Sequence, residues 1–333
     1  MSLPISFPIA PMEAQSAEQL PRGAEWLYEP KWDGFRCIAF RDGDGVRLQS
    51  KAGKPLGRYF PDLVELLLGL KARRFVLDGE IVIPVGGRLS FDELLLRIHP
   101  AASRVQTLAE AHPARYVVFD LLADERGSDL TGKPLSERRR RLEAFARRYF
   151  PRGGAVRLSP VTWRRTTAEG WLRNRTRGDT DGVVAKRVDL PYRSGQRDGM
   201  EKVKRQHTAD CVVGGFRYAS KGGGIGSLLL GLYNSKGLLD HVGFTSSLPR
   251  EVRVGLRERL EALIKPPGFT GQAPGGPSRW STERSAAWEP LAPKLVVEVG
   301  YDHVSGGRFR HATRFLRWRP DKAPRQCTCD QIA

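Results

Sequence analysis

The segment from Glu29 to Arg36, E-P-K-W-D-G-F-R, places a lysine beside a tight turn that leads into a strand. Lys31 stands at the mouth of this turn, which Asp33 followed by Gly34 predicts. A lysine amine is a useful nucleophile only when it is neutral, although the ordinary pKa of the group is about 10.4. Burial and neighbouring cations favour the neutral form. Alone, the segment also fits an exposed hairpin with a solvated lysine, so the rest of the sequence must decide.

Five further segments place charged or aromatic side chains in or beside predicted strands. Glu80 lies in an otherwise apolar strand, where an unpaired carboxylate would be costly. Lys202 and Lys204 are two residues apart and therefore point to one face of a strand. If these strands converge on Lys31, four cations would activate the amine and hold a triphosphate, namely Arg36, Lys186, Lys202 and Lys204. The segments are V-L-D-G-E-I-V (76–82), Y-V-V-F-D-L-L (116–122), D-G-V-V-A-K-R (181–187), M-E-K-V-K-R (200–205) and R-P-D-K (319–322).

Hydrophobic patterning predicts the elements that position these residues in the first part of the chain. Short apolar or alternating runs bounded by Gly, Asp or Pro predict strands, at 36–40, 75–85, 116–122 and 182–187. Helical periodicity predicts helices, at 61–70, 91–97 and 136–149. The last helix is expected to be capped by Ser136 and to end before Pro151. This mixed order predicts an α+β domain rather than a βαβ repeat.

Strand signals dominate after about residue 207. Five strands are predicted, at 209–216, 227–233, 238–244, 294–300 and 308–318. One helix is predicted at 250–264, and a Pro/Gly-rich loop at 266–277. Five short strands and a helix in a basic segment indicate a closed β-barrel of the OB type. We therefore predict two domains, residues 1–206 and residues 207–333.

Composition restricts the function classes. The chain of 333 residues is 40% hydrophobic and 28% charged, as in a globular protein, and its formal net charge is +18. A polyanion would relieve this self-repulsion, with nucleic acid as the first candidate and an anionic membrane surface as the second. No apolar run approaches the ~20 residues that span a bilayer, and the N-terminus is a poor signal peptide. These features predict a cytoplasmic, nucleoid-associated protein without a membrane role, and the lack of heptads predicts a monomer.

The four cysteines are too few to staple a chain of this length. Cys37 and Cys211 lie in apolar stretches and are expected to be core thiols. Cys327 and Cys329 form a C-T-C near the tail, with two histidines upstream. This spacing lacks the paired C-x-x-C or H-x-x-x-H elements of zinc sites, so we expect reduced thiols.

In their order, the six segments resemble the six motifs of the covalent nucleotidyltransferases, which comprise DNA ligases, RNA ligases and messenger-RNA capping enzymes. The surrounding sequence is most similar to short bacterial ATP-dependent DNA ligases of the ligase C type and to the ligase module of bacterial ligase D. The resemblance covers nearly the whole chain, from about Leu3 to the tail. It implies an adenylation domain of antiparallel sheets flanked by helices, followed by an OB-fold barrel. It also implies that a lysyl-AMP forms, that AMP moves to the 5′-phosphate of a DNA nick, and that the 3′-hydroxyl displaces it, with DNA repair as the setting.

The resemblance implies a role for each matching residue. Lys31 would carry AMP from ATP, and Glu29 would contact adenine. Phe119 would stack on adenine, although an aromatic ring in such a strand is also an ordinary core residue. Glu80 and Asp181 would hold ribose or a divalent metal, Mg²⁺ or Mn²⁺. The cations would bind the rest of ATP: Arg36 near ribose and phosphate, Lys202 and Lys204 at the α-phosphate, Lys186 as a further residue of the nucleotide pocket, and Arg319 and Lys322 at the leaving pyrophosphate.

Two positions depart from the family pattern. Asp181 stands where the family usually has glutamate, but the shorter side chain still suits a hard cation, directly or through water. Lys51 stands where an arginine usually grips the nick phosphate as a fork, and lysine offers only a point charge. We expect Lys51, Arg58, Arg217 and Lys221 to contact DNA, because they neighbour the motifs or lie on the glycine-rich loop of the barrel.

Several expectations concern partners and alternatives. The arginine clusters at 138–141 and 147–148 are expected to form a solvated helix face. Glu25 already leads into the first motif, which leaves no room for the additional DNA-binding domain of large ligases. A weak, distributive ligase recruited by a repair polymerase or an end-binding protein is therefore expected. Two alternatives remain. One is an RNA ligase or a capping enzyme, where use of ATP would indicate a ligase and use of GTP a capping enzyme. The other is a nucleic-acid-binding protein without catalytic activity.

Overall fold

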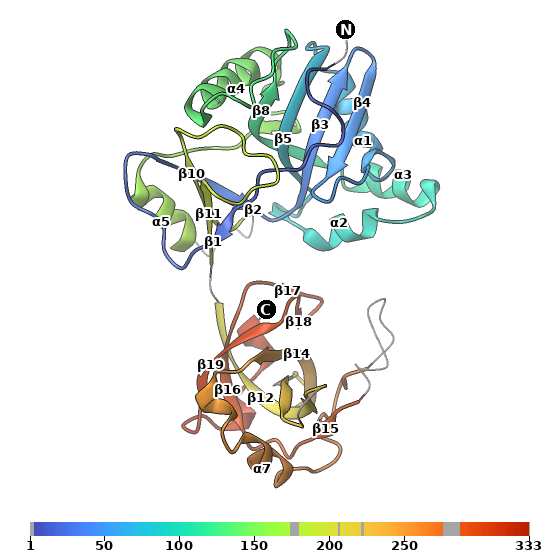
Figure 1. Ribbon diagram of the computed structural model, residues 1–333. Coiled ribbons are helices and arrows are strands. Elements are labelled where there is room, and N and C mark those ends of the chain that lie inside the picture. The colour runs from blue at the N-terminus through green and yellow to red at the C-terminus, as the bar shows by residue number, and fades with distance from the viewer. Residues whose placement is uncertain (1–2, 174–179, 206, 221–222, 276–286, 333) are drawn as a thin grey trace. The chain divides into compact units, whose positions relative to one another are not determined.

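The computed structural model describes residues 3–173, 180–205, 207–220, 223–275 and 287–332. The chain divides into two compact units, Met1–Arg205 and Gln206–Ala333 (Figure 1). Lys221, one of the predicted DNA contacts, lies outside the described residues. None of the described helices combines the length and the apolar character needed to cross a membrane.

A five-stranded sheet in the order β4-β3-β5-β8-β9 forms the larger half of the first unit. Neighbouring strands are antiparallel except for β8 and β9, which are parallel. One side of the sheet contributes Phe75 and Tyr116 to a hydrophobic cluster, which helix residues such as Leu63 and Leu142 complete. The strands are β3 (Phe35–Asp42), β4 (Gly45–Ser50), β5 (Arg74–Val82), β8 (Arg115–Ala123) and β9 (Val156–Leu158).

A four-stranded sheet in the order β1-β11-β10-β2 forms the other half. It consists of β1 (Gln15–Ser16), β2 (Trp26–Trp32), β10 (Thr180–Arg187) and β11 (Met200–Lys204). The register sets Val184 of β10 opposite both Glu29 of β2 and Lys202 of β11, and Lys31 opposite Gly182. The pairing of β2 with β10 thereby brings together segments that lie far apart in the sequence. A separate hairpin consists of β6 (Pro84–Val85) and β7 (Arg88–Leu89).

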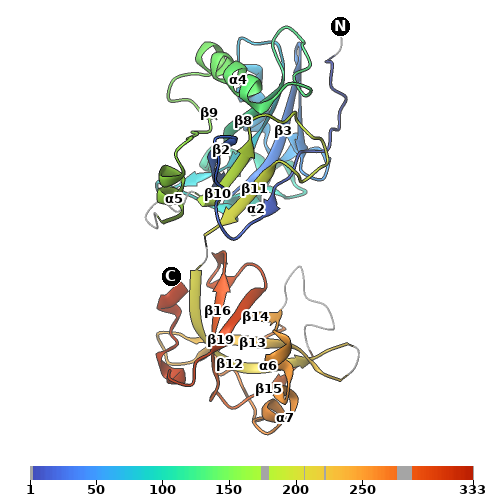
Figure 2. The same ribbon diagram turned by 60° about the vertical axis from the view of Figure 1, so that its left-hand side comes forward.

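Helices cover the sheets of the first unit. The longest, α4, packs on β8 (Figure 2), and α5 contacts β2 and β10. Pro61 at the first turn favours the start of α1, and the Ser90 side chain caps α2 by accepting a hydrogen bond from the Glu93 backbone. The helices are α1 (Pro61–Leu68), α2 (Phe91–Arg97), α3 (Ala102–Ala111), α4 (Leu135–Tyr149) and α5 (Arg165–Arg173).

The second unit is a closed five-stranded barrel. Its strands pair in a ring in the order β12-β13-β14-β19-β16 and back to β12, with β14 and β19 parallel. Two short helices connect β14 to β16 as in an OB fold. The elements are β12 (His207–Tyr218), β13 (Ile225–Tyr233), β14 (Leu239–Ser247), α6 (Arg250–Arg253), α7 (Leu256–Glu261), β15 (Glu289–Pro290), β16 (Val296–Tyr301), β17 (Val304–Ser305), β18 (Arg308–Phe309) and β19 (Thr313–Trp318).

Three local predictions are wrong. The predicted helix at 250–264 is divided into α6 and α7, because Gly255 between them takes the left-handed φ of +63°. Ser136 does not cap α4, which begins one residue earlier after Pro134. The strand predicted at 308–318 is interrupted and forms β18 and β19.

The arginines of α4 do not form one solvated face. Arg138 and Arg139 are only 2% and 8% exposed. Arg138 forms a bidentate ion pair with Asp120, and Arg139 pairs with Glu143 and donates to a backbone carbonyl. The pattern of charges along the helix predicted exposed arginines. It cannot show that a carboxylate of β8 lies beneath the helix and pairs with one of them. Arg140, Arg147 and Arg148 are exposed, as expected.

Candidate active site

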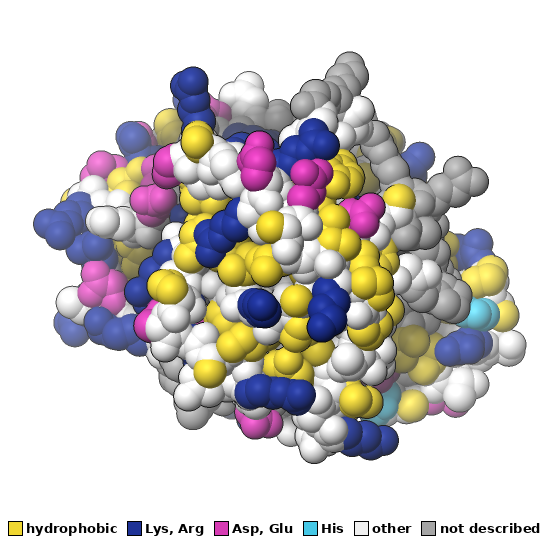
Figure 3. Space-filling view, turned by 90° about the horizontal axis from the view of Figure 1, so that it is seen from below, with side chains coloured by type: hydrophobic (Ala, Val, Ile, Leu, Met, Phe, Trp, Pro, Cys, Tyr) yellow, Lys and Arg dark blue, Asp and Glu magenta, His cyan; other side chains and the backbone are white. Residues whose placement is uncertain are grey.

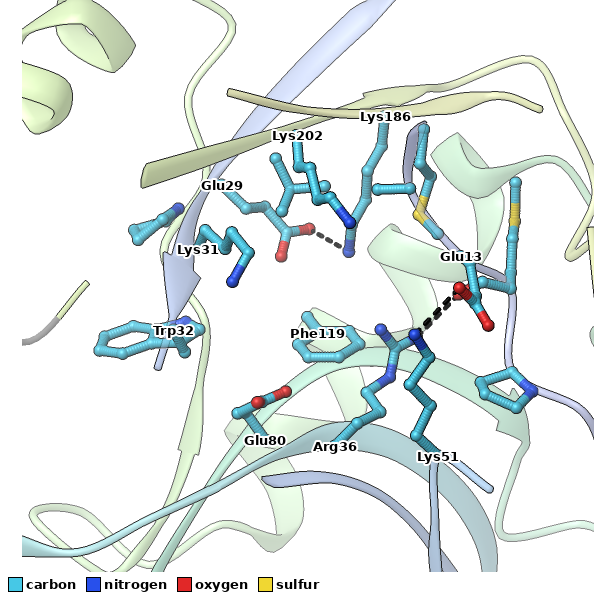
Figure 4. A pocket seen from close by; sticks show the side chains of 16 residues that line it. Glu13, Glu29, Lys31, Trp32, Arg36, Lys51, Glu80, Phe119, Lys186 and Lys202 are labelled. Atoms are coloured by element: carbon cyan, nitrogen blue, oxygen red, sulfur yellow. Dashed lines mark hydrogen bonds and ion pairs between the residues drawn. The ribbon is translucent and has the colours of Figure 1, made fainter. Parts of the chain in front are cut away.

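A pocket opens between the two sheets of the first unit (Figure 4). Strands β2, β10 and β11 supply one wall, β3, β5 and β8 the opposite wall, and residues 11–14 a further side. The predicted strands therefore do converge on Lys31. The predicted residues that line the pocket are Glu29, Lys31, Lys51, Arg36, Glu80, Phe119, Lys186 and Lys202.

Lys31 lies near the end of β2 and forms an ion pair with Asp181. Its Nζ lies 2.8 Å from Asp181 Oδ2, and the two side chains are 23% and 3% exposed. Two glycines allow the strands to come this close: a Cβ on Gly182 would collide with a carbonyl oxygen of β11, and one on Gly34 with a carbonyl oxygen of β5. The glycine of the first motif is thus required by close packing between strands.

Glu29 and Lys186 form a buried ion pair across β2 and β10. Lys186 Nζ lies 3.0 Å from Glu29 Oε1, and the side chains are 7% and 2% exposed. The ring of Phe119 lies against two cations of the pocket (Figure 4): its centroid is 4.4 Å from Lys186 Nζ and 4.5 Å from Arg36 Cζ. These are cation–π distances. Phe119 is buried, yet it also forms part of the pocket wall.

Arg36 is held by a carboxylate that the sequence analysis did not single out. Its Nε and Nη2 each donate to Asp78, at 2.6 Å, and Asp78 also accepts from the Tyr192 hydroxyl at 2.7 Å. Burial opposes the charge on Arg36, but the adjacent Asp78 raises its pKa above the ordinary value. The alternation of side chains along β5 puts Asp78 on the same face as Glu80. This pattern could have identified Asp78 as a residue near the pocket. Nothing in the sequence indicates Tyr192.

Glu80 faces the pocket from β5, opposite Arg36 on β3. Desolvation by the enclosing protein raises its pKa to about 8, although Arg36 and Lys31 act in the opposite direction. Asp78, two residues earlier, is the fully buried carboxylate of this strand, and it is paired. The sequence suggested that an unpaired carboxylate in this apolar strand would be costly. Asp78 avoids this cost because it is paired, and Glu80 avoids it because it faces a cavity.

The N-terminal segment brings Glu13 to the pocket, where it pairs with Lys51. The distance from Lys51 Nζ to Glu13 Oε2 is 3.0 Å, and the side chains are 59% and 26% exposed. Backbone contacts hold the segment here: Met12 N–H donates to Tyr192, Met12 carbonyl accepts from Arg36, and β1 pairs with β11. Lys51 lowers the pKa of Glu13. A proline-rich segment without periodicity carries no sequence signal for this placement.

Lys202 and Lys204 lie on one face of β11, as predicted, but only Lys202 lines the pocket. Lys204 is opposite Gly182 and so lies nearer the Lys31 end of β10. Desolvation lowers the pKa of Lys202, and Lys31, Lys51 and Lys204 lower it further. The pocket thus contains a lysine whose positive charge is not fully compensated.

The remaining predicted residues lie elsewhere. Arg58 is exposed, donates to the Pro100 carbonyl and lies over the Tyr59 ring at 5.1 Å. In the barrel, Arg217 lines a separate groove of that unit together with Arg253 and Trp288. On the face shown in Figure 3, Lys and Arg side chains are scattered among apolar and acidic ones instead of forming one continuous patch. Arg319 and Lys322 both form ion pairs with Asp210. The Cys327 thiol belongs to the hydrophobic core of the barrel.

Comparison with known proteins identifies the family. A model described as "ATP dependent DNA ligase domain" matches residues 11–204, and one described as "ATP dependent DNA ligase C terminal region" matches residues 221–322. DNA ligase C2 of Mycolicibacterium smegmatis is 44% identical over 349 aligned positions, which cover 100% of this chain and 96% of the relative. DNA ligase C of Mycobacterium tuberculosis is 41% identical over 348 positions, with the same coverage.

The solved structures agree. The ligase domain of M. tuberculosis LigD superimposes with a TM-score of 0.50 and 27% sequence identity, covering 96% of this chain and 98% of the other. The predicted fold class and the predicted enzyme class are confirmed. The chain, which uses ATP and acts on DNA, belongs to the family of ATP-dependent DNA ligases.

Proposed function

We propose that Lys31 becomes the AMP carrier and that the protein seals nicks with a 3′-hydroxyl and a 5′-phosphate. The observation that supports this most directly is the position of the Lys31 amine, which is in a pocket, 2.8 Å from a carboxylate and surrounded by cations suited to phosphate. An ordinary surface lysine is solvated and is not enclosed by a pocket of this kind.

The first step forms a bond between Lys31 Nζ and the α-phosphorus of ATP and breaks the bond from that phosphorus to the bridging oxygen. Pyrophosphate leaves with the bond electrons. The amine must lose a proton to solvent, and Asp181 Oδ2, 2.8 Å away, orients the amine by accepting its hydrogen bond. Lys202 in the pocket, with Lys204 beside it on β11, would offset the charge that develops on the phosphate.

The base and ribose would occupy the rest of the pocket. Glu29 would contact the adenine, Phe119 would stack on it, and Arg36 would contact the ribose and phosphate. Lys186 would keep Glu29 fixed, because the two form a buried pair at 3.0 Å. Asp78 and Tyr192 orient Arg36 before the nucleotide binds, which lowers the entropy cost of nucleotide binding.

Glu80 and Asp181 would hold a divalent cation. Both are carboxylates at the Lys31 end of the pocket, close enough to each other for Asp181 to affect the pKa of Glu80. Carboxylate oxygens are the donors that Mg²⁺ and Mn²⁺ prefer. When bound, such a cation would neutralise charge on the phosphates of ATP.

The later steps require DNA. AMP moves from Lys31 to the 5′-phosphate, giving a DNA-adenylate, and the 3′-hydroxyl then forms the phosphodiester and releases AMP. We propose Lys51 as the contact to the nick phosphate, Arg58 and Arg217 as further DNA contacts, and Arg319 and Lys322 as the residues that orient pyrophosphate. A role in DNA repair, a recruiting polymerase or end-binding protein, and a monomeric enzyme complete the proposal.

The test uses purified protein, stripped of bound AMP with pyrophosphate, and α-labelled ATP or GTP with Mg²⁺. We expect ATP label on the denatured wild type and its discharge by a nick with a 5′-phosphate. Lys31→Ala should reduce labelling by at least ~10³-fold, because it removes the nucleophile itself. Lys71→Ala, which changes an exposed lysine outside the pocket, is the matched control and should label normally.

Each contrary outcome has a definite meaning. Normal labelling of Lys31→Ala would assign the AMP carrier to another residue. Label from GTP, or discharge only by RNA, would support a capping enzyme or RNA ligase. The absence of label in the stripped wild type would support a non-catalytic nucleic-acid binder.

A further inference from the structure

Asp210 links the two cations that the motif R-P-D-K contributes to the barrel. It lies on β12, is 8% exposed, and precedes these cations by more than a hundred residues. Asp210 Oδ1 accepts a hydrogen bond from Arg319 Nη1 at 2.8 Å, and Asp210 Oδ2 accepts one from Lys322 Nζ at 2.7 Å. One carboxylate thus joins both ends of the turn that contains the motif.

The Arg319 guanidinium is held from a second side as well. Its Nε and Nη2 donate to Asp321, at 3.0 and 2.9 Å, in a fork arrangement. The backbone N–H of Lys322 donates to the Arg319 carbonyl at 3.2 Å and closes the turn. The side chains of Arg319 and Lys322 remain 19% and 24% exposed. They are therefore fixed in orientation while part of each still faces solvent.

The position of Asp210 is itself fixed by the C-terminal tail. The Gln331 side chain accepts a hydrogen bond from the Asp210 N–H at 3.0 Å and donates one to the Asp210 carbonyl at 3.1 Å. A side-chain amide has both a donor and an acceptor, so it can pair with both backbone groups of one residue. The contacts form a chain in which Gln331 orients Asp210, and Asp210 orients Arg319 and Lys322.

We propose that Asp210 is a positioning residue, which holds Arg319 and Lys322 as one unit to receive the negative charge of the leaving pyrophosphate. This rests on the function proposed above. Arg and Lys side chains are flexible, and ordering both only when ATP arrives would slow the reaction. Asp210 orders them beforehand, and it takes no part in the bonds that form or break. A carboxylate needed only for stability would have no effect specific to the step that releases pyrophosphate.

Separate assays of the ligation steps test this assignment. In Asp210→Asn, the side-chain size and the backbone contacts to Gln331 remain, but the charge that orders the cations is lost. We expect the KM for ATP to rise and the adenylylation rate to fall, together by about tenfold or more in kcat/KM. The pyrophosphate concentration needed to discharge AMP from the enzyme should rise in parallel. Sealing of a nick that already carries AMP should change less than about twofold, because this step releases no pyrophosphate.

Three further variants complete the design. Asp330→Asn removes one exposed negative charge from the same tail without a contact to either cation, and it should behave as wild type. Gln331→Ala should show a smaller loss in the same direction as Asp210→Asn, and it keeps the assignment testable if that variant does not fold. Arg319→Ala examines the role of the motif itself.

The outcomes separate the two levels of the proposal. The positioning role is overturned if Asp210→Asn adenylylates at the wild-type rate while Arg319→Ala is slow. It is equally overturned if Asp210→Asn loses adenylylation and sealing of the adenylylated nick to the same extent, since this would indicate general damage to the barrel. Normal adenylylation by Arg319→Ala would instead contradict the proposed function of the motif.

Discussion

The cations of the pocket in the first unit and those of the barrel are compensated in different ways. In the pocket, Lys186 and Glu29 come from different strands and are almost completely buried. In the barrel, Arg319 and Lys322 come from one turn, share Asp210 and remain partly exposed. Losing Lys186 leaves the buried Glu29 without this partner, whereas losing Lys322 leaves Asp210 its ion pair with Arg319. The pocket charges therefore stabilise the first unit as well as its site, and the barrel charges mainly determine how two side chains are presented.

The largest expected effect is on stability, from Lys186→Met. It should lower the free energy of unfolding by about 3–5 kcal/mol, because the buried Glu29 loses its partner. The double variant Glu29→Gln with Lys186→Met should recover part of this loss. Urea unfolding followed by circular dichroism provides the measurement. Lys322→Met is the barrel counterpart and should cost no more than about 1 kcal/mol. Equal costs for the two single variants would remove the distinction between the regions.

A strong pH dependence is expected from Glu80. Its pKa of about 8 means that the carboxyl group is protonated at neutral pH in the ligand-free protein. If the carboxylate form binds metal or ribose, the adenylylation rate at limiting Mg²⁺ should rise up to about tenfold per pH unit below pH 8. Glu80→Gln should be slow and should lack this slope. A wild-type profile that is flat from pH 6 to 8 would exclude a role for ionised Glu80.

The same shift has a consequence for stability with the opposite pH dependence. A carboxyl group with a raised pKa in the folded state stabilises the protein below its unfolded pKa of about 4.5, and this contribution is lost as the pH rises through about 8. Glu80→Gln, which imitates the neutral form, should therefore match the wild type at acidic pH and exceed its stability above pH 8. Thermal unfolding across this range would show whether the two curves diverge.

A smaller effect is expected at alkaline pH from Lys202. Its pKa is lowered, chiefly by desolvation, so it loses its charge at a lower pH than an ordinary lysine. The adenylylation rate should fall on this alkaline limb. Lys202→Arg keeps the charge at every accessible pH and should move the limb upward, even if its rate at neutral pH is reduced about tenfold by altered geometry. An unchanged limb would assign the alkaline fall to another group.

The smallest effect is expected from the exposed pair of Lys51 and Glu13. Lys51→Ala should weaken binding of a nick with a 5′-phosphate by about three- to tenfold and leave binding of a nick without that phosphate unchanged. Stability should change by less than about 1 kcal/mol, because the pair is largely exposed. Nick affinity that is the same with and without Lys51 would refute this contact. A larger loss of stability would show that this ion pair behaves energetically like a buried pair.

Local patterning predicted most strands because each has a strong apolar repeat. Helix α2 was predicted with its observed bounds, Phe91–Arg97, from its helical pattern alone. The failures have local causes that compete with the pattern. Gly255 takes a left-handed conformation that ends α6, although residues on both sides of it are good helix formers. Helix α3 was not predicted. Only Val105 and Ala109 of this helix are buried, which is too few to give a recognisable helical repeat of apolar residues.

The sequence by itself determined which side chains are candidates for the chemistry: a lysine before a turn, carboxylates in apolar strands and paired lysines on one face. These features depend on residue type and on spacing within a strand, which the sequence contains directly. Only the tertiary structure decided which charges meet. It pairs Arg36 with Asp78 rather than Glu80, brings Glu13 to Lys51, and assigns Asp210 to both cations of the barrel. The physical reason is that an ion pair depends on distance in space, and strand registers, not separations along the chain, determine that distance.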